Sequence, residues 1–436
     1  MAVAACGVYE ASWLARLHAA SAQALYLHLP FCVRKCAYCD FTSFATGRDD
    51  PAMETYASSL EQEVTMASNA RLLECCETAY LGGGTPTMLG PKLLARLVSL
   101  VLEAAPRISE LTVEANPDSL SDETFAALVD AGTTRVSIGV QSFDDAELRA
   151  LGRVHDAQTA RDRVAASVSS GLDVSLDLMC ATPLQTEESW KRSLEQAISL
   201  GVCHVSVYPL QIEEGTPLAK TLGEAEPDWN APEVQASRME LAAEMLAEAG
   251  FARYEVASYA LPGKACRHNQ AYWNGHPYLG LGVSAASMLT REGYGRMRNA
   301  WPGLPSIPSD ISRIRMTCEA ANKPFSPKDG LPSQQLELEL LTEGQAAAED
   351  LMLGMRRTAG IDSGLIAIAG RVLGEDRVNE SIDTLVDRGL ATWRDGRLVP
   401  THEGWLLGNE LYGALWELSE GEVLTLSVQQ DCKQGC

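Results

Sequence analysis

Hydrophobic and polar positions alternate between two periods along the first 250 residues of the chain. Short segments in which polarity changes at every residue are separated by longer segments in which apolar residues recur every three or four positions. The first pattern is typical of strands and the second of amphipathic helices. The first pattern predicts strands at 25–29, 78–81, 110–115, 135–140, 172–178 and 203–208. The second pattern predicts helices at 51–69, 91–104, 122–131, 157–170, 188–200 and 231–250. Strands that alternate with helices indicate an α/β fold with a parallel sheet.

The predicted strands are polar on one parity and apolar on the other. Asp173, Ser175 and Asp177 alternate with apolar residues, and Glu114 and Gln141 occupy the polar parity of their own strands. Glu114, Gln141 and Asp177 all stand at carboxyl ends of strands, where α/β barrels build their active sites. An antiparallel sheet with one solvent-exposed face would show the same alternation, but the long helices between the predicted strands argue against an antiparallel sheet. We therefore expect a polar lumen that holds a polar ligand.

Three cysteines follow the first predicted strand on one short loop. Cys32, Cys36 and Cys39 offer soft sulfur ligands, which suit an iron–sulfur cluster. Phe41 stands two residues after the third cysteine, so the loop holds no fourth thiol and one iron of a [4Fe–4S] cluster would stay open. A structural zinc site is the alternative, but it needs four ligands, and His28 is the nearby candidate for the fourth.

The cysteine spacing resembles a known superfamily signature. The Cys-x3-Cys-x2-Cys loop is similar to that of the radical S-adenosylmethionine (SAM) superfamily, and the glycine run 82–84 resembles its SAM-contacting glycine motif. Glycines remove Cβ atoms and let a backbone approach a ligand. The resemblance implies a partial (β/α)6 TIM-like radical SAM barrel, with SAM bound to the open iron and cleaved by an electron from the cluster.

Longer strings narrow the resemblance. From residue 25 to about residue 287 the chain is similar to the oxygen-independent coproporphyrinogen III oxidases and their relatives, the HemW-type haem chaperones. The matching strings include LYLHLPFCVRKCAYCDF, GGGTPT, EANPDSL, SIGVQSFDDAELRALGRVH, YPLQIEEGTPL and CRHNQAYW. The resemblance implies a cluster on Cys32, Cys36 and Cys39 that Tyr38 shields, and SAM contacts from Tyr26, Gly83, Gly84, Thr85, Glu114, Gln141, Arg153 and Asp177.

Two branches of that family imply different functions. The oxidases carry a further cysteine where this chain has Phe41, and they have a longer N-terminal extension. The chaperones carry His-Asn-x-x-Tyr-Trp, which is present here at 268–273. The favoured interpretation is a haem chaperone that binds a cluster, SAM and haem and delivers haem to acceptor proteins; the alternative is an oxygen-independent coproporphyrinogen III oxidase. His268 is the expected haem ligand, and Cys266 and His276 are alternatives. An ordinary surface histidine beside buried aromatics is the alternative structural explanation of the same string.

One position departs from the family pattern. The family usually has Gly-Leu-Pro after the fifth strand, whereas this chain has Cys180-Ala181-Thr182-Pro183. Alanine tolerates a positive φ poorly compared with glycine. We therefore expect the turn that follows Asp177 to differ.

The C-terminal third predicts a second unit. A proline-rich segment at 301–335 is expected to be a linker or insertion after a barrel at 24–300, which an N-terminal segment at 1–23 precedes. Helices at 345–357, 378–388 and 403–417 and a hairpin at 391–399 then predict a winged-helix-like domain over 336–436. Glu380, Asp383 and Asp387 crowd its second helix, and like charges repel phosphates.

Composition limits the partners. The 436 residues are 46% hydrophobic and carry a formal net charge of −23, which opposes nucleic-acid binding. No apolar run reaches the length of a membrane span, the N-terminus lacks the order of a signal peptide, and twelve cysteines mostly in apolar segments suit a reducing compartment. We expect a cytoplasmic protein that is not integral to a membrane, with haem and haem-accepting proteins, membrane-bound acceptors included, as partners; a homodimer is compatible with the sequence.

Overall fold

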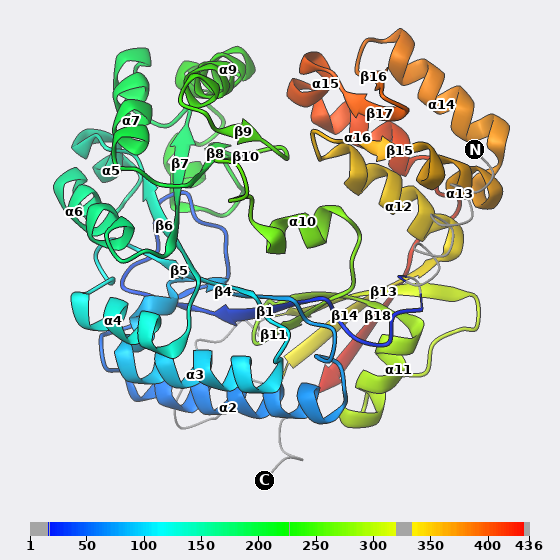
Figure 1. Ribbon diagram of the computed structural model, residues 1–436, viewed down its shortest axis with the longest axis horizontal. Helices are drawn as coiled ribbons and strands as arrows, with labels where there is room; N and C mark the ends of the chain where they lie inside the picture. The colour runs from blue at the N-terminus through cyan, green and yellow to red at the C-terminus, as the bar shows by residue number, and fades with distance from the viewer. Residues whose placement is uncertain (1–15, 17, 226, 320–333, 431–436) are drawn as a thin grey trace.

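The computed structural model describes residues 16, 18–225, 227–319 and 334–430, so most of the predicted N-terminal segment 1–23 lies outside the described residues. Thirteen of the described strands form one sheet, in the order β18-β14-β13-β12-β11-β1-β4-β5-β6-β7-β8-β10-β9 (Figure 1). The sheet has a parallel half, which contains the predicted site residues, and an antiparallel half.

The parallel half confirms the predicted alternation of strands and helices. Every neighbouring pair from β11 through β1 to β8 is parallel. The strands are β1 (Ala24–Leu29), β4 (Thr78–Gly83), β5 (Glu110–Ala115), β6 (Arg135–Gln141), β7 (Asp173–Cys180), β8 (His204–Pro209) and β11 (Tyr278–Leu281). The sequence pattern missed β11, because four residues are too few to establish a period.

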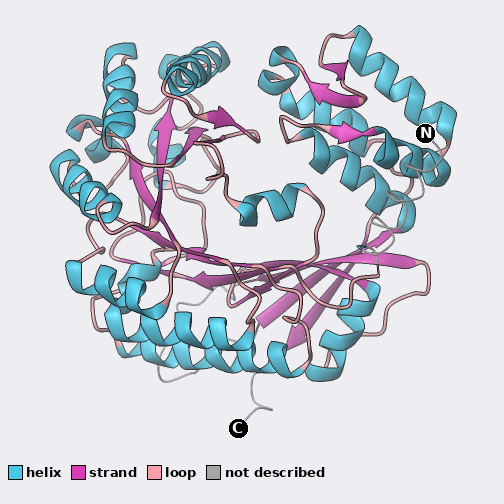
Figure 2. Ribbon diagram, viewed as in Figure 1, coloured by secondary structure: helices cyan, strands magenta, loops and turns pink. Residues whose placement is uncertain are grey.

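Amphipathic helices cover the outer face of this sheet. They are α2 (Pro51–Asn69), α3 (Gly90–Ala104), α4 (Asp122–Ala131), α6 (Ala157–Val168), α7 (Glu187–Ser199) and α9 (Pro232–Glu248). Local capping sets their ends: the Ser121 hydroxyl accepts from the Thr124 amide at the start of α4, and Gly132, with φ 99°, ends that helix. Figure 2 shows these helices on the convex side of the sheet, whereas α10 (Arg267–Trp273) lies on the concave side.

The sheet curves but does not close. β1 and β11 run nearly flat in Figure 1, and β6, β7 and β8 rise steeply from them. Among the described strands, β8 pairs next with β10 (Ser258–Ala260), which in turn pairs with β9 (Ala252–Arg253), so β8 does not return to β1. This arrangement is the predicted partial barrel, with the polar parity of its strands toward the concave side.

The antiparallel half extends the sheet beyond β11. It consists of β12 (Ala286–Thr290), β13 (Ile311–Glu319), β14 (Gln334–Thr342) and β18 (Leu424–Gln430), and α11 (Arg291–Ala300) follows β12. Part of the segment 301–335, which we expected to be a linker or insertion, is therefore a strand of the main sheet; residues 320–333 lie outside the described residues. Ile314, Met316 and Cys318 are buried on one parity of β13, an alternation that the surrounding prolines obscured.

The C-terminal unit has its own hydrophobic core and a winged-helix-like arrangement. It contains α12 (Glu343–Met355), β15 (Ile361–Asp362), α13 (Ser363–Leu373), α14 (Glu375–Asp387), β16 (Ala391–Arg394), β17 (Arg397–Pro400), α15 (His402–Leu406) and α16 (Gly408–Trp416). The predicted hairpin turns at Asp395 and Gly396, with φ 51° and 73°. The helix predicted at 403–417 is two helices, because the backbone breaks at Leu407.

A buried charge cluster joins the antiparallel strands to this unit. Arg313 on β13 pairs with Glu349 at 2.6 Å and with Asp350 at 2.8 Å, both on α12. All three side chains are at most 6% exposed. The guanidinium group of Arg356, at the end of α12, lies 5.3 Å from the ring centre of Trp273 on α10. The C-terminal unit is thus packed against the helix that carries the His-Asn-x-x-Tyr-Trp string.

Candidate metal and cofactor site

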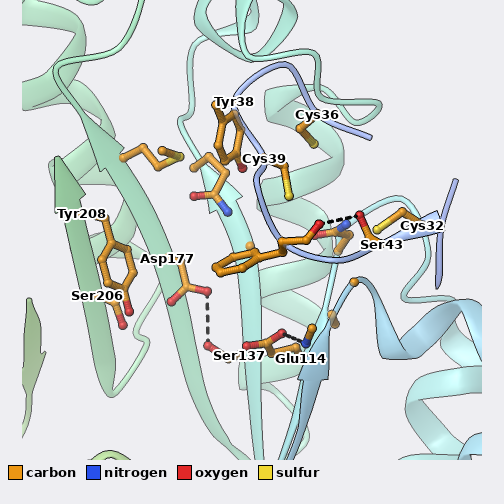
Figure 3. A pocket seen from close by; sticks show the side chains of 18 of the residues that line it. Cys32, Cys36, Tyr38, Cys39, Ser43, Glu114, Ser137, Asp177, Ser206 and Tyr208 are labelled. Atoms are coloured by element: carbon orange, nitrogen blue, oxygen red, sulfur yellow. Dashed lines mark hydrogen bonds between the residues drawn. The ribbon is translucent and has the colours of Figure 1, made fainter. Parts of the chain in front are cut away.

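A cavity of about 510 Å³ opens on the concave side of the sheet at the carboxyl ends of the parallel strands. Figure 3 shows the three cysteine sulfurs on one side of it and the carboxylates of Glu114 and Asp177 on another. The predicted site residues that line it are Cys32, Cys36, Tyr38, Cys39, Gly83, Gly84, Glu114, Gln141, Arg153 and Asp177. Tyr26, Thr85 and His268 do not line the cavity and lie behind its wall.

The cysteine loop is held from two sides. Its start pairs with a short parallel strand, since β2 (Phe31–Cys32) lies beside β3 (Phe44–Ala45). Its middle rests on the residues after α5 (Asp145–Ala150): the Ala37 amide donates to the Leu151 carbonyl at 3.0 Å. Gly152, with φ 75°, allows this close approach, because a Cβ there would lie 3.0 Å from the Ala37 nitrogen. The string around Gly152 therefore shapes the loop that presents the thiols.

The thiols fit a cluster better than a single ion. No group of three or more His, Cys, Asp or Glu side chains in the described residues is close enough to hold one metal ion. The cysteines of a cluster bind different irons, so their sulfurs stand farther apart than the ligands of one ion. Burial raises the pKa of the Cys39 thiol to about 11 and also raises that of Cys32. Metal coordination would supply the positive charge that keeps these half-buried thiols deprotonated.

His28 is not placed as a fourth ligand of a zinc site. Its Nε2 hydrogen-bonds with the Thr42 carbonyl at 2.9 Å, and its Nδ1 hydrogen-bonds with the Tyr26 hydroxyl at 3.2 Å. The ring is buried and does not line the cavity. Both nitrogens are therefore occupied away from the cysteines.

Two half-buried carboxylates form the opposite wall. Glu114 accepts from the Tyr80 hydroxyl at 2.8 Å and from the Gly83 amide at 3.1 Å. Burial raises its pKa to about 7, and the nearby charge of Asp177 contributes to the shift. Burial likewise raises the pKa of Asp177 to about 6, although hydrogen bonding by Ser206 opposes the shift. These carboxylates can accept hydrogen bonds from ligand hydroxyls or balance a ligand's positive charge.

The glycine run is required by packing within the protein. A Cβ at Gly82 would lie 2.9 Å from a Glu114 oxygen, and one at Gly83 would lie 2.6 Å from the His28 ring. A Cβ at Gly84 would lie 2.8 Å from the Phe31 carbonyl oxygen. The glycines thus let Glu114 and the cysteine segment close onto β4, and Gly83 and Gly84 also line the cavity.

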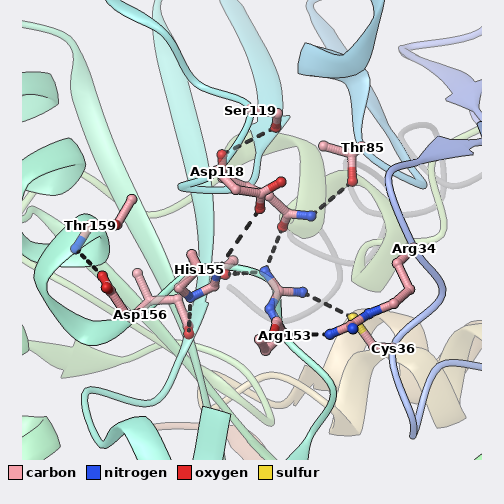
Figure 4. A network of polar contacts seen from close by, with 12 residues as sticks. Arg34, Cys36, Thr85, Asp118, Ser119, Arg153, His155, Asp156 and Thr159 are labelled. Carbon is pink, nitrogen blue, oxygen red and sulfur yellow. Dashed lines mark hydrogen bonds and ion pairs between the residues drawn. The ribbon is translucent and has the colours of Figure 1, made fainter. Parts of the chain in front are cut away.

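Arg153 lines the cavity and is held there by several hydrogen bonds. Its Nη2 donates to Asn116 Oδ1 at 2.7 Å and to the Gly139 carbonyl at 2.6 Å, and its Nη1 donates to Cys36 Sγ at 3.5 Å (Figure 4). Its Nε is buried and has no hydrogen-bond partner in the part of the chain that the structure describes. A buried donor without a partner is costly, so an anionic ligand group beside Arg153 fits this site.

Two backbone positions at the rim adopt left-handed conformations without glycine. Gln141 has φ 67° at a register shift between β6 and β7, and such sparsely populated conformations concentrate at functional sites. Ala181, in the turn that departs from the family pattern, has φ 53°. Gln185 accepts from the Ala181 amide at 2.8 Å and donates to the Met179 carbonyl at 3.1 Å, which holds this turn in place. The side chain of Gln185 thus stabilises a turn that alanine disfavours.

His268 is buried behind the cavity wall. Its Nδ1 hydrogen-bonds with the Thr78 hydroxyl at 3.0 Å, and its Nε2 hydrogen-bonds with the Tyr272 hydroxyl at 2.9 Å. The side chain is 1% exposed, and burial lowers its pKa to about 3. In this conformation both ring nitrogens are occupied, so neither faces a metal. Of the alternatives, Cys266 lines the cavity and donates to Glu110, while His276 is half-buried and does not line the cavity.

Sequence reasoning missed several lining residues. Asn116, Arg135, Ser137 and Ser206 all line the cavity. Ser137 and Ser206 lie on the polar parity already recognised, and Asn116 extends the parity of Glu114 by one step beyond β5. Parity alone, applied to whole strands and their first following residues, would have identified them.

Comparisons with known proteins agree with this geometry. The model of the radical SAM superfamily matches residues 26–197. Heme chaperone HemW of Mycobacterium tuberculosis is 32% identical over 90% of this chain and 94% of its own length, and that of Bacillus subtilis is 33% identical over 89% and 98%. The solved structure of coproporphyrinogen III oxidase from Escherichia coli, at 20% identity, shares the fold with a TM-score of 0.69 over 94% of this chain and 92% of that one.

Membrane spanning by a helix is not observed. In the part of the chain that the structure describes, no helix combines the length and the apolar character that crossing a bilayer requires. Similarity over about nine-tenths of the chain to two bacterial relatives identifies the family, and the superfamily match over the cysteine loop and the shared fold agree with it. The chain belongs to the HemW family of radical SAM proteins.

Proposed function

We propose that this protein is a haem chaperone that binds a [4Fe–4S] cluster, SAM and haem, and delivers haem to acceptor proteins. The observation that carries the proposal is the placement of three thiols, with Phe41 instead of a further cysteine, on a cavity that two half-buried carboxylates also line. Similarity to Heme chaperone HemW along nearly the whole chain supports it.

Different residues of the cavity would bind the cluster and SAM. Cys32, Cys36 and Cys39 would hold the cluster, which supplies an open iron and a transferable electron when bound. The unused donor of Arg153 suits the carboxylate of SAM, whereas Glu114 and Asp177 suit its hydroxyls and positive charge. Acceptor proteins, including membrane-bound ones, and a homodimer stay predictions.

SAM affinity is expected to fall at acidic pH. Ionised Glu114 and Asp177 favour a cationic ligand, and their pKa values are about 7 and 6. Below these values each group must lose its proton on binding, which weakens affinity about tenfold per pH unit per group. Anaerobic equilibrium dialysis of SAM between pH 8 and pH 5.5 measures this, and Glu114→Gln should bind SAM more weakly at pH 8 and show a shallower pH dependence.

Stability of the SAM-free protein should show the opposite trend. Because both carboxyl pKa values are raised above the unfolded values of about 4, the folded state binds more protons between about pH 4 and pH 7. These two groups therefore contribute stability at low pH that is lost as pH rises through their folded pKa values. A pH-independent SAM affinity in a folded protein would contradict the assigned role of the carboxylates.

Haem ligation by His268 requires release of its Nε2 from Tyr272. Tyr272→Phe removes the hydroxyl that occupies this nitrogen, so we expect haemin to bind up to about tenfold more tightly, the value of one hydrogen bond. His268→Ala should lose the Soret shift that haemin titration produces. The matched control is Tyr278→Phe, because the Tyr278 ring packs on Tyr272 at 4.4 Å but forms no hydrogen bond with His268.

Other outcomes would reassign the haem ligand. If Tyr272→Phe and His268→Ala both bind haemin like the parent protein, His268 only anchors α10 to β4. Cys266→Ala and His276→Ala then identify which of the two alternatives moves the Soret band.

An oxidase is the second candidate function. The fold of this chain matches that of coproporphyrinogen III oxidase from Escherichia coli over almost the whole length of both chains. The test is an anaerobic assay for protoporphyrinogen IX with coproporphyrinogen III, SAM and a reductant. Sustained turnover would establish the oxidase; haemin binding without turnover favours the chaperone.

A further inference from the structure

Two of the three cysteine thiols are joined by a relay of polar side chains. On one side, Cys32 Sγ lies 3.5 Å from the Thr85 hydroxyl oxygen, and Asn116 Nδ2 donates to that same oxygen at 2.8 Å. On the other side, Asn116 Oδ1 accepts from Arg153 Nη2 at 2.7 Å, and Arg153 Nη1 donates to Cys36 Sγ at 3.5 Å. The Asn116 amide is thus the centre of a chain that ends on a sulfur atom at each side, part of which Figure 4 shows.

The two ends of the amide fix the direction of every hydrogen bond in the relay. Because Asn116 donates to the Thr85 oxygen, the hydroxyl hydrogen of Thr85 remains free to donate to Cys32. The amide oxygen accepts from Arg153, which keeps another guanidinium N–H directed at Cys36. Both ends of the relay therefore present donors to sulfur. Thr85 is 3% exposed and Arg153 is 9% exposed, so water competes little for these bonds.

Donors to cysteine sulfur favour the more negative state of an iron–sulfur cluster. Reduction adds an electron whose charge spreads onto the sulfur ligands, and hydrogen bonds to those sulfurs stabilise it. The relay is anchored by protein groups rather than by solvent, since Arg153 also donates to the Gly139 carbonyl at 2.6 Å. Its geometry is set by β5 and β6, far along the chain from the cysteine loop.

We propose that Asn116 is a positioning residue that raises the reduction potential of the cluster by aiming Thr85 at Cys32 and Arg153 at Cys36. The inference rests on the proposed binding of a cluster by the three cysteines. It adds a residue outside the cysteine loop that controls how readily the cluster accepts its electron.

The isosteric variant Asn116→Asp tests the direction of the relay. A carboxylate keeps the bond from Arg153 but can no longer donate to Thr85, so the Thr85 hydroxyl turns toward the carboxylate and leaves Cys32. We expect the reduction equilibrium of the reconstituted cluster to become about tenfold less favourable, equivalent to about 59 mV for one electron. An anaerobic redox titration followed by electron paramagnetic resonance, without SAM, measures the midpoint potential at equal iron and sulfide content.

Two further variants separate the effect of the relay's hydrogen bonds on the reduction potential from the effect of an added negative charge. Thr85→Val removes the donor to Cys32 without changing charge, and it should lower the potential in the same direction. Asn269→Asp adds one negative charge to the same cavity, and no hydrogen bond joins Asn269 to Thr85 or Arg153 among the described contacts. It should lower the potential less than Asn116→Asp does. In the Thr85→Val background, Asn116→Asp should have only the effect of its charge, because the two changes share one bond.

The outcomes distinguish this inference from the proposed function. If the parent protein assembles no cluster, the proposed function fails before any variant is compared. If the cluster assembles and Thr85→Val leaves its potential unchanged, or Asn116→Asp matches Asn269→Asp, the relay does not tune it. For a variant too unstable to titrate, iron release to a chelator is the second readout: Thr85→Val should release iron faster than the parent, and equal rates would overturn the inference.

Discussion

Replacing any one of Cys32, Cys36 and Cys39 with alanine is expected to abolish cluster assembly. Each thiol would bind a different iron, so the loss of one thiol leaves one iron without its cysteine ligand. Iron and acid-labile sulfide in anaerobically reconstituted protein should fall from about four of each per chain to near zero. The matched control is Cys75→Ala, because Cys75 is an exposed thiol on α2's trailing loop and does not line the cavity.

The same measurement tests the zinc alternative. Zinc without sulfide in the parent protein, lost in all three cysteine variants, would assign the loop to a structural zinc site. Iron and sulfide that survive each single substitution would show that another part of the chain holds the cluster.

Removing the buried guanidinium of Arg313 should destabilise the fold strongly. Arg313→Met removes the guanidinium that pairs with Asp350 and that shares Glu349 with Arg315, and breaking such a buried pair costs about 3–5 kcal/mol. Urea unfolding followed by circular dichroism should show a midpoint far below that of the parent. Arg377→Ala, which breaks an exposed pair with Glu420, is the control and should cost at most about 1 kcal/mol.

A rescue variant separates charge from packing in this cluster. Combining Arg313→Met with Glu349→Gln and Asp350→Asn also removes the two negative charges that Arg313 balances, and it should restore part of the lost stability. A triple variant as unstable as Arg313→Met would show that the loss comes from packing rather than from the charge of these carboxylates.

The sequence predicted the parts of the fold that depend on local periodicity. The predicted helix at 51–69 and the strand at 110–115 coincide with α2 and β5, because each carries enough residues to establish its period and its ends. β13 was expected to lie in a linker, since its nine residues stand among prolines. Its partners are the strands just before and just after it in the chain, β12 and β14, but both lie outside the short window in which a strand's own alternation is read.

The candidate site likewise contains residues that local sequence predicts and residues whose environment depends on distant parts of the chain. The spacing of the cysteines and the parity of Glu114 and Asp177 are local, and all these residues line one cavity. The burial of His268 is not local: it depends on Thr78, which lies 190 residues away in the sequence. The sequence string that contains His268 therefore indicates the family. Whether the ring nitrogens of His268 are free to bind a metal depends on the strands and helices that pack around it.

The winged-helix-like unit is tethered at both ends. The chain enters it from β14 and leaves it into β18, and these two strands pair with each other as neighbours in the main sheet. Topologically the unit is an insertion between two adjacent strands, so two chain segments connect it to the sheet rather than one flexible linker. Swinging it away from α10 would require bending at two neighbouring strand ends at once, which confines its motion to rotation about one hinge axis. A short turn that joins Thr342 directly to Leu424 would excise the unit and leave the sheet order intact.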